Sequence, residues 1–126
     1  MNDEKLTEKV IGAAFQVHNQ LGFGFLESVY EKALSIELNK LEIEHQTQSP
    51  ITVYYQQQIV GEFICDVLIE KRLILELKSV TQLTVAHEVQ LVNYLAATKI
   101  DIGLLINFGP SKVDIKRKYR DYKPKQ

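Results

Sequence analysis

The sequence predicts an α/β fold in which helices flank a mixed β-sheet. Two amphipathic helical patterns come first, and three stretches rich in β-branched and aromatic residues follow them. A third helical pattern then separates these stretches from two more strand-like segments. Three consecutive strands followed by a crossover helix and another strand indicate a mixed sheet. The order is therefore α-α-β-β-β-α-β-β, which excludes a helical bundle and a β-sandwich.

Helices are predicted where apolar residues recur every three or four positions. The first pattern covers residues 6–21, and Gly22-Phe23-Gly24 ends it. The second runs over about residues 26–41 and the third over about residues 85–98. Strands are predicted from β-branched and aromatic content, with Pro50 opening this part of the chain and Gln56-Gln57-Gln58 forming a polar turn. The predicted strands are residues 51–55, 59–69, 73–80, 100–108 and 112–119.

Composition is that of one globular domain spanning residues 1–126. With 45% apolar and 25% charged residues, the chain can bury a core, which argues against intrinsic disorder. No apolar run is long enough for a membrane-spanning helix, and the charged N-terminal segment lacks the apolar stretch of a secretory signal. A single cysteine, Cys65, is typical of a protein in a reducing compartment. We expect it to be a small residue of the core. We therefore expect a cytoplasmic protein without a membrane partner.

Charge is unevenly distributed although the net charge is only −1. Residues 112–126 carry seven Lys or Arg against two Asp, so a basic C-terminal segment follows an acidic body. Such a segment could contact the phosphates of a nucleic acid. The alternative is a solvated chain end without a partner.

Glu76 and Lys78 interrupt the most apolar stretch of the chain, residues 73–80, and Asp66 lies on the predicted strand before it. If residues 70–72 form a hairpin loop, Asp66 lies opposite Glu76, and Lys78 shares the face of Glu76. Two carboxylates this close repel each other unless a proton or a cation lies between them, and Mg²⁺ serves well in that position. Lys78 could then orient a water molecule or offset charge in a phosphoryl transition state. The alternative is a solvent-facing hairpin with an ordinary Glu–Lys pair.

Two further polar pairs lie at helical spacing. On the third predicted helix, Gln90 and Tyr94 share one face, opposite an apolar face that includes Val85 and Val89. This pair could be a solvated stripe or could be half covered by another element. Glu27 near the start of the second helix is explained by the helix dipole alone, which leaves Tyr30 and the preceding glycines unexplained.

Together these residues resemble the bacterial GxxExxY protein family of the PD-(D/E)XK nuclease-like superfamily. The resemblance covers about residues 6–119 and rests on these motifs in the family order: Gly24-x-x-Glu27-x-x-Tyr30, Asp66, Glu76-x-Lys78, His87-Glu88-x-Gln90 and the segment 103–109. It implies a restriction-endonuclease-like core with a mixed sheet of four to five strands. Cys65 stands where the family motif has its proline, and that position contributes no chemistry.

The resemblance also assigns roles to residues. It implies that Asp66, Glu76 and the main-chain carbonyl of Leu77 hold Mg²⁺ or Mn²⁺, with Glu27 as a further carboxylate ligand. It places Lys78 at the attacking water and Gln90 with Tyr94 beside the metal and the substrate. The implied function is a metal-dependent nuclease whose partner is nucleic acid, with DNA favoured over RNA. The alternative is a catalytically silent module of the same fold that acts with a protein partner or as a homo-oligomer.

Overall fold

The helices and strands follow the predicted order. The computed structural model describes residues 1–121. The helices are α1 (Asp3–Leu21), α2 (Glu27–Lys40) and α3 (Val85–Thr98). The strands are β1 (His45–Tyr55), β2 (Gln58–Ile69), β3 (Leu73–Lys78), β4 (Ile102–Phe108) and β5 (Val113–Tyr119).

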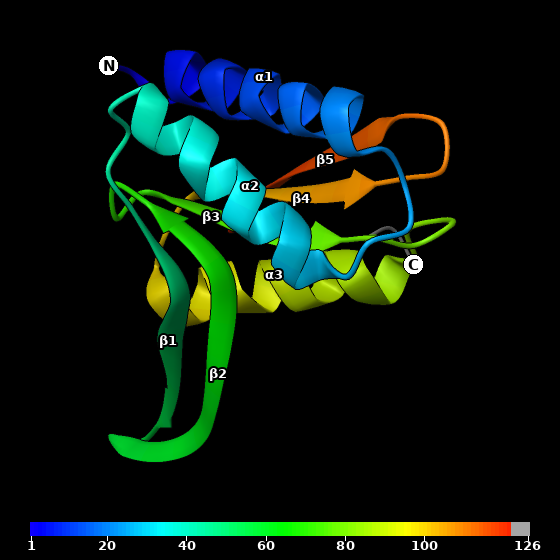
Figure 1. Cartoon of the computed structure of the whole chain (residues 1–126). Coiled ribbons are helices and arrows are strands. Elements are labelled where there is room, and N and C mark those ends of the chain that lie inside the picture. Colours follow the sequence, from blue (N-terminus) through cyan, green and yellow to red (C-terminus); the bar gives the residue numbers. More distant parts are fainter. Residues whose placement is uncertain (122–126) are drawn as a thin grey trace.

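The five strands form one sheet in the order β1-β2-β3-β4-β5. Only β3 and β4 pair in parallel, and α3 makes the crossover between them; the other neighbours are antiparallel. Helices α1 and α2 lie over one face of the sheet and α3 lies over the other (Figure 1). The mixed sheet flanked by helices is therefore confirmed, and it matches the restriction-endonuclease-like α/β fold.

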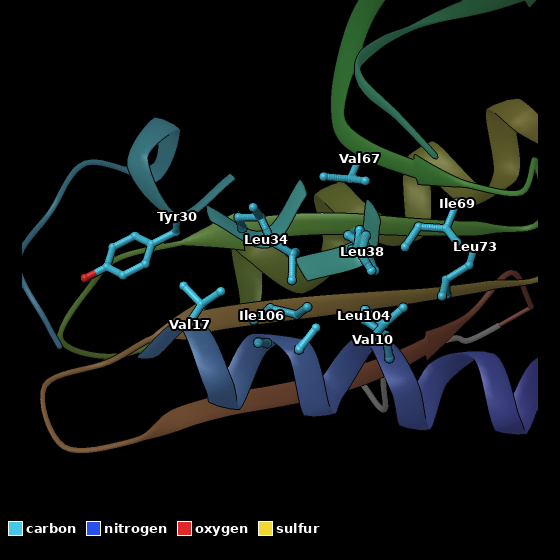
Figure 2. Close-up of a cluster of buried hydrophobic side chains, with 14 of the residues drawn as sticks. Val10, Val17, Tyr30, Leu34, Leu38, Val67, Ile69, Leu73, Leu104 and Ile106 are labelled. Atoms are coloured by element: carbon cyan, nitrogen blue, oxygen red, sulfur yellow. The ribbon is translucent and has the colours of Figure 1, made fainter. Parts of the chain in front are cut away.

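The alternation of side chains along β3 builds a core on each side of the sheet. Leu73, Leu75 and Leu77 point toward α1 and α2, into a large apolar cluster whose members include Leu34 and Ile106 (Figure 2). On the other face, Ile74 packs in a smaller cluster beneath α3. Because both faces of β3 are covered, any charged side chain on this strand lies in a partly desolvated place.

The turn between α1 and α2 explains the glycines and Tyr30 of the family motif. Gly22 and Gly24 have φ values of 71° and 115°, which residues other than glycine rarely adopt. The buried Tyr30 hydroxyl donates a hydrogen bond to the Gly22 carbonyl at 2.5 Å, and its ring stacks on Phe108 at 4.3 Å. Tyr30 thus fixes the turn that delivers Glu27 to the first turn of α2, and its role is structural.

The β1–β2 hairpin is longer than the sequence predicted. Strand β1 begins at His45 and continues through Pro50, which sequence reasoning took as a boundary. Proline is tolerated here because β1 is the edge strand and has a neighbour on one side only, so its missing N–H need not leave a hydrogen bond to another strand unmade. Gln56 and Gln57 make the turn with positive φ angles. The hairpin projects past α3 (Figure 1).

The orientation of α3 reverses one expectation. Leu91, Tyr94 and Leu95 are its buried residues, whereas Val85 and Val89 are 67% and 40% exposed. The sequence marked those valines as the apolar face, but the sheet covers the neighbouring face instead. An apolar strip of α3 is therefore left facing outward.

The basic C-terminal segment 112–126 begins as a strand, since β5 occupies most of its first half. Several of its cations are held within the fold: Lys118 pairs with Glu88, and Arg120 pairs with Asp101 at 2.9 Å. Residues 122–126 lie outside the described part of the chain. None of the described helices is long and apolar enough to cross a membrane.

Candidate active site

The site is built where β2 and β3 part from each other. The two strands pair from Ile69↔Leu73 to Val67↔Leu75, and the next step sets Asp66 opposite Glu76, as the sequence predicted. At this step the main-chain N–H groups donate to side-chain carboxylates instead of to carbonyls of the opposite strand. The Asp66 N–H donates to Glu76 Oε2 at 2.8 Å, and the Leu77 N–H donates to Asp66 Oδ2 at 2.7 Å. Each carboxylate is thus held by the main chain of the opposite strand.

Burial and mutual repulsion set the protonation of this pair. Glu76 is buried, and desolvation together with the nearby Asp66 carboxylate raises the pKa of Glu76 to about 7. Burial also raises the pKa of Asp66, against the opposing effects of the Leu77 N–H and the Lys78 ammonium. The pair therefore holds less than its full negative charge near neutral pH unless a cation joins it.

Lys78 follows on the same face of β3 and is half-buried. Its ammonium charge lowers the pKa of both Asp66 and Glu76, so it lies within electrostatic reach of the pair. In the parallel neighbour β4, the partner of Lys78 is the buried Asn107. The Asn107 side chain accepts a hydrogen bond from the Val80 N–H and donates one to the Val80 carbonyl, both at 2.9 Å. Asn107 thereby anchors the chain as it leaves Lys78 for α3.

Helix α3 brings the predicted polar pair to the same place. Gln90 Nε2 donates to the Tyr94 hydroxyl at 3.2 Å. Burial, followed by the charges of Glu76 and Asp66, raises the pKa of Tyr94. Tyr94 is buried and lies within electrostatic reach of both carboxylates, whereas Gln90 is exposed, so the pair is half covered.

Two residues near the carboxylates were missed from the sequence. Gln48 in β1 has a φ of 52° and donates to Glu31 Oε1 at 2.5 Å, and its side chain lowers the pKa of Asp66. The Glu31 charge raises the pKa of Glu76, and the Glu27 charge raises that of Asp66. Glu31 had a signal, since it lies four residues after Glu27 on one helix face. Gln48 had none, because its placement depends on the pairing of β1 with β2.

The donor set suits a hard divalent cation. Mg²⁺ is commonly held by one or two carboxylates with water completing the shell, and Asp66 and Glu76 offer two adjacent carboxylates that repel each other without a cation. Within residues 1–121 no group of three His, Cys, Asp or Glu side chains is arranged to hold a metal. The fit therefore rests on the Asp66–Glu76 pair, and coordination by Glu27 stays a prediction. Cys65 is no alternative ligand, because burial raises the pKa of its thiol to about 11.

Asn107 should be essential for the stability of the site. We expect Asn107→Leu, which keeps the branched shape of the side chain without its polar atoms, to destabilise the protein by about 2–4 kcal/mol, because it leaves the Val80 N–H and C=O without their partners. Urea unfolding measures this difference, with the exposed Asn39→Leu as the matched control. Equal stabilities of the two variants would contradict the anchoring role.

Comparisons with known proteins bear on this geometry. A family model described as the PD-(D/E)XK nuclease superfamily matches residues 4–118. The crystal structure of the protein SSO0001 is similar with a TM-score of 0.61 and 16% sequence identity, over 96% of this chain. The chain spans 60% of that protein's length, and the likeness concerns the fold. No curated protein matches the sequence.

Proposed function

Because the chain belongs to the PD-(D/E)XK nuclease superfamily, we propose that it is a divalent-metal-dependent nuclease that hydrolyses phosphodiester bonds, with DNA favoured over RNA as its substrate. The observation that carries this proposal is the pair of opposed carboxylates, Asp66 and Glu76, with Lys78 on the same strand face. An ordinary surface pair would be exposed, whereas Glu76 is only 5% exposed and its pKa is raised. Such perturbed groups cluster at functional sites.

Asp66, Glu76 and the main-chain carbonyl of Leu77 would hold Mg²⁺ or Mn²⁺, with Glu27 as a further ligand. The bound metal would supply Lewis-acid activation of water and stabilisation of phosphate charge. The protein's own contribution is rigidity. The reciprocal hydrogen bonds between β2 and β3 hold both carboxylates in place before any ligand arrives.

Lys78, Gln90 and Tyr94 would handle the substrate. The Lys78 ammonium would orient the attacking water and offset the negative charge that grows on the phosphate. Gln90 and Tyr94 are already joined by a hydrogen bond, so the Tyr94 hydroxyl is left able to donate toward a phosphate oxygen or a metal-bound ligand. Three separate elements, β2, β3 and α3, thus supply the proposed catalytic groups.

One observation favours a second function, a silent binding module that acts with a protein partner or as a homo-oligomer. Each carboxylate already accepts a main-chain N–H, so the pair is partly satisfied without a metal. Calorimetric titration with Mn²⁺ separates the two functions. Binding that disappears in Asp66→Asn supports the nuclease, and an absence of binding by the wild type supports the silent module.

The proposed nuclease is tested directly with labelled single-stranded DNA, duplex DNA and RNA in Mn²⁺. We expect hydrolysis by the wild type and a loss of roughly 100-fold or more in Lys78→Met, because the transition state loses its ammonium group. Lys71→Met is the matched control, since Lys71 is exposed in the β2–β3 loop and should retain full activity. Equal activity in the two variants would assign the hydrolysis to another site or another protein.

A further inference from the structure

A groove runs between the projecting β1–β2 hairpin and the outward face of α3. Its volume is about 1030 Å³. The hairpin lines it with Val53, Tyr54 and Phe63, and α3 lines it with the strip that includes Val85 and Val89. This volume is at the upper end of the range for small-molecule sites, so the groove is larger than one small ligand needs.

Most of the residues that line the groove are apolar or aromatic. Tyr54 and Phe63 are 64% and 48% exposed, and the Phe63 ring lies 5.9 Å from the ring of Tyr94 at an interplanar angle of 41°. Exposed aromatic rings on a rigid hairpin give flat surfaces against which another ring can stack. The proposed chemistry of the carboxylate pair does not use these faces.

The polar groups of the groove favour an anionic ligand with hydrogen-bonding edges. Gln90 and Asn93 contribute amides, and Lys99 contributes an ammonium group. None of the described residues that line the groove is Asp or Glu. In a chain with more acidic than basic residues, this region is therefore free of carboxylates that would repel a phosphate backbone.

Helix α3 links the groove to the proposed active site through Tyr94. Gln90 and Tyr94 line the groove. Tyr94 also packs in the same buried cluster as Cys65, the residue directly before Asp66 in β2, and the charges of Glu76 and Asp66 contribute to raising its pKa. A chain that passes the carboxylate pair would thus have its neighbouring residues directed along the groove. This link through Tyr94 distinguishes the groove from an apolar patch elsewhere on the surface.

We propose that the groove binds unpaired nucleotides adjacent to the phosphate at the carboxylate pair, so that the substrate of this protein is a single strand or a single-stranded end. The inference rests on the proposed nuclease function. In a duplex the faces of the bases are covered by their neighbours, so only unpaired bases can stack on Tyr54 and Phe63. Stacking is tolerant of sequence, because every base has an aromatic face.

The test is the binding of a fluorescent dT12 oligonucleotide and of a blunt duplex of equal length, followed by anisotropy in Ca²⁺ without Mn²⁺ or Mg²⁺. Tyr54→Ala should weaken dT12 binding by about ten-fold, the effect of losing one stacked base, and leave duplex binding unchanged. Tyr55→Ala is the matched control, because Tyr55 is 60% exposed on the same hairpin and does not line the groove. Tyr54→Phe keeps the stacking face and should bind as the wild type does.

A second variant acts through charge. Val85→Glu introduces a carboxylate into the groove at the first turn of α3, where an acidic residue favours the helix. We expect it to weaken dT12 binding by at least as much as Tyr54→Ala. Thermal melts of both variants should match the wild type, because both positions are more than 60% exposed.

The outcomes separate this inference from the proposed function. If wild-type protein hydrolyses DNA through Lys78 but Tyr54→Ala and Tyr55→Ala bind dT12 equally, the groove is not the strand site. If dT12 binding depends on Tyr54 and Val85 while no hydrolysis occurs, the strand site stands and the nuclease function fails. A wild type that does not bind dT12 overturns the inference. A change of oligomeric state in Tyr54→Ala, seen by sedimentation without loss of dT12 binding, would assign the groove to contact between copies and overturns it also.

Discussion

Glu76→Gln should raise the melting temperature of the metal-free protein at pH 8 by roughly 10 °C. The wild-type carboxyl has a pKa of about 7 in the fold, against an ordinary value of 4.5. A carboxyl whose pKa is raised by folding gives up its proton more readily in the unfolded state, so stability falls as pH rises from about 4.5 to about 7. The shift corresponds to a loss of about 3 kcal/mol in the free energy of unfolding of the wild type at pH 8. The variant avoids this loss because Gln is neutral.

The experiment is a series of thermal melts in EDTA from pH 4 to pH 8. The wild type and Glu76→Gln should converge near pH 4, where Glu76 is protonated in both the folded and the unfolded chain. Glu62→Gln is the matched control, because Glu62 is an exposed residue of β2, the strand that pairs with β3. A wild-type melting temperature that rises between pH 5 and pH 8 would show that attraction to Lys78 outweighs burial, and would contradict the prediction.

Asp66→Asn should abolish the stabilisation of the protein by Mn²⁺ while leaving the metal-free fold intact. Asn still offers a carbonyl oxygen to the Leu77 N–H, and it removes a carboxylate whose pKa is raised by burial. In EDTA the variant should therefore melt at the wild-type temperature or above it. A metal at 100 times its dissociation constant stabilises a protein by about 2.7 kcal/mol, which is roughly 5–10 °C for a domain of this size.

Thermal melts of both proteins in EDTA and in Mn²⁺ at pH 8 test this expectation. Asp114→Asn serves as the matched control, since Asp114 lies on the surface in an ion pair with Lys112. The control should respond to Mn²⁺ as the wild type does. If Asp66→Asn melts lower in EDTA and the wild type ignores Mn²⁺, then Asp66 forms a structural salt bridge and the metal site is elsewhere.

Periodicity along the chain was sufficient for most of the fold. The helical spacing of residues 85–98 predicted the bounds of α3, and the three-residue loop before Leu73 predicted the pairing of Ile69 with that residue. From that pairing alone, Asp66 and Glu76 could be placed opposite each other. Local rules suffice here because a short loop determines the register of the hairpin that it closes.

The sequence did not reveal which face of α3 is covered. Val85 and Val89 look like core residues on a helical wheel, yet Tyr94 and Leu91 pack against the sheet in their place. A helix's own pattern cannot show how far a neighbouring hairpin extends. Here the hairpin projects past α3 (Figure 1). Part of the apolar surface of α3 therefore lines a groove between the two elements instead of the core.

By itself, then, the sequence determined the order of the elements, from which the mixed sheet follows through the crossover helix between β3 and β4. It also determined the opposition of Asp66 to Glu76, which depends on a short loop between residues near in the chain. The tertiary structure decided how Gln48, Glu31 and Tyr94 gather around that pair, since they come from β1, α2 and α3. It also decided that Glu76 is buried, and burial is what raises its pKa. Desolvation depends on every element packed around a group, so no local pattern reports it.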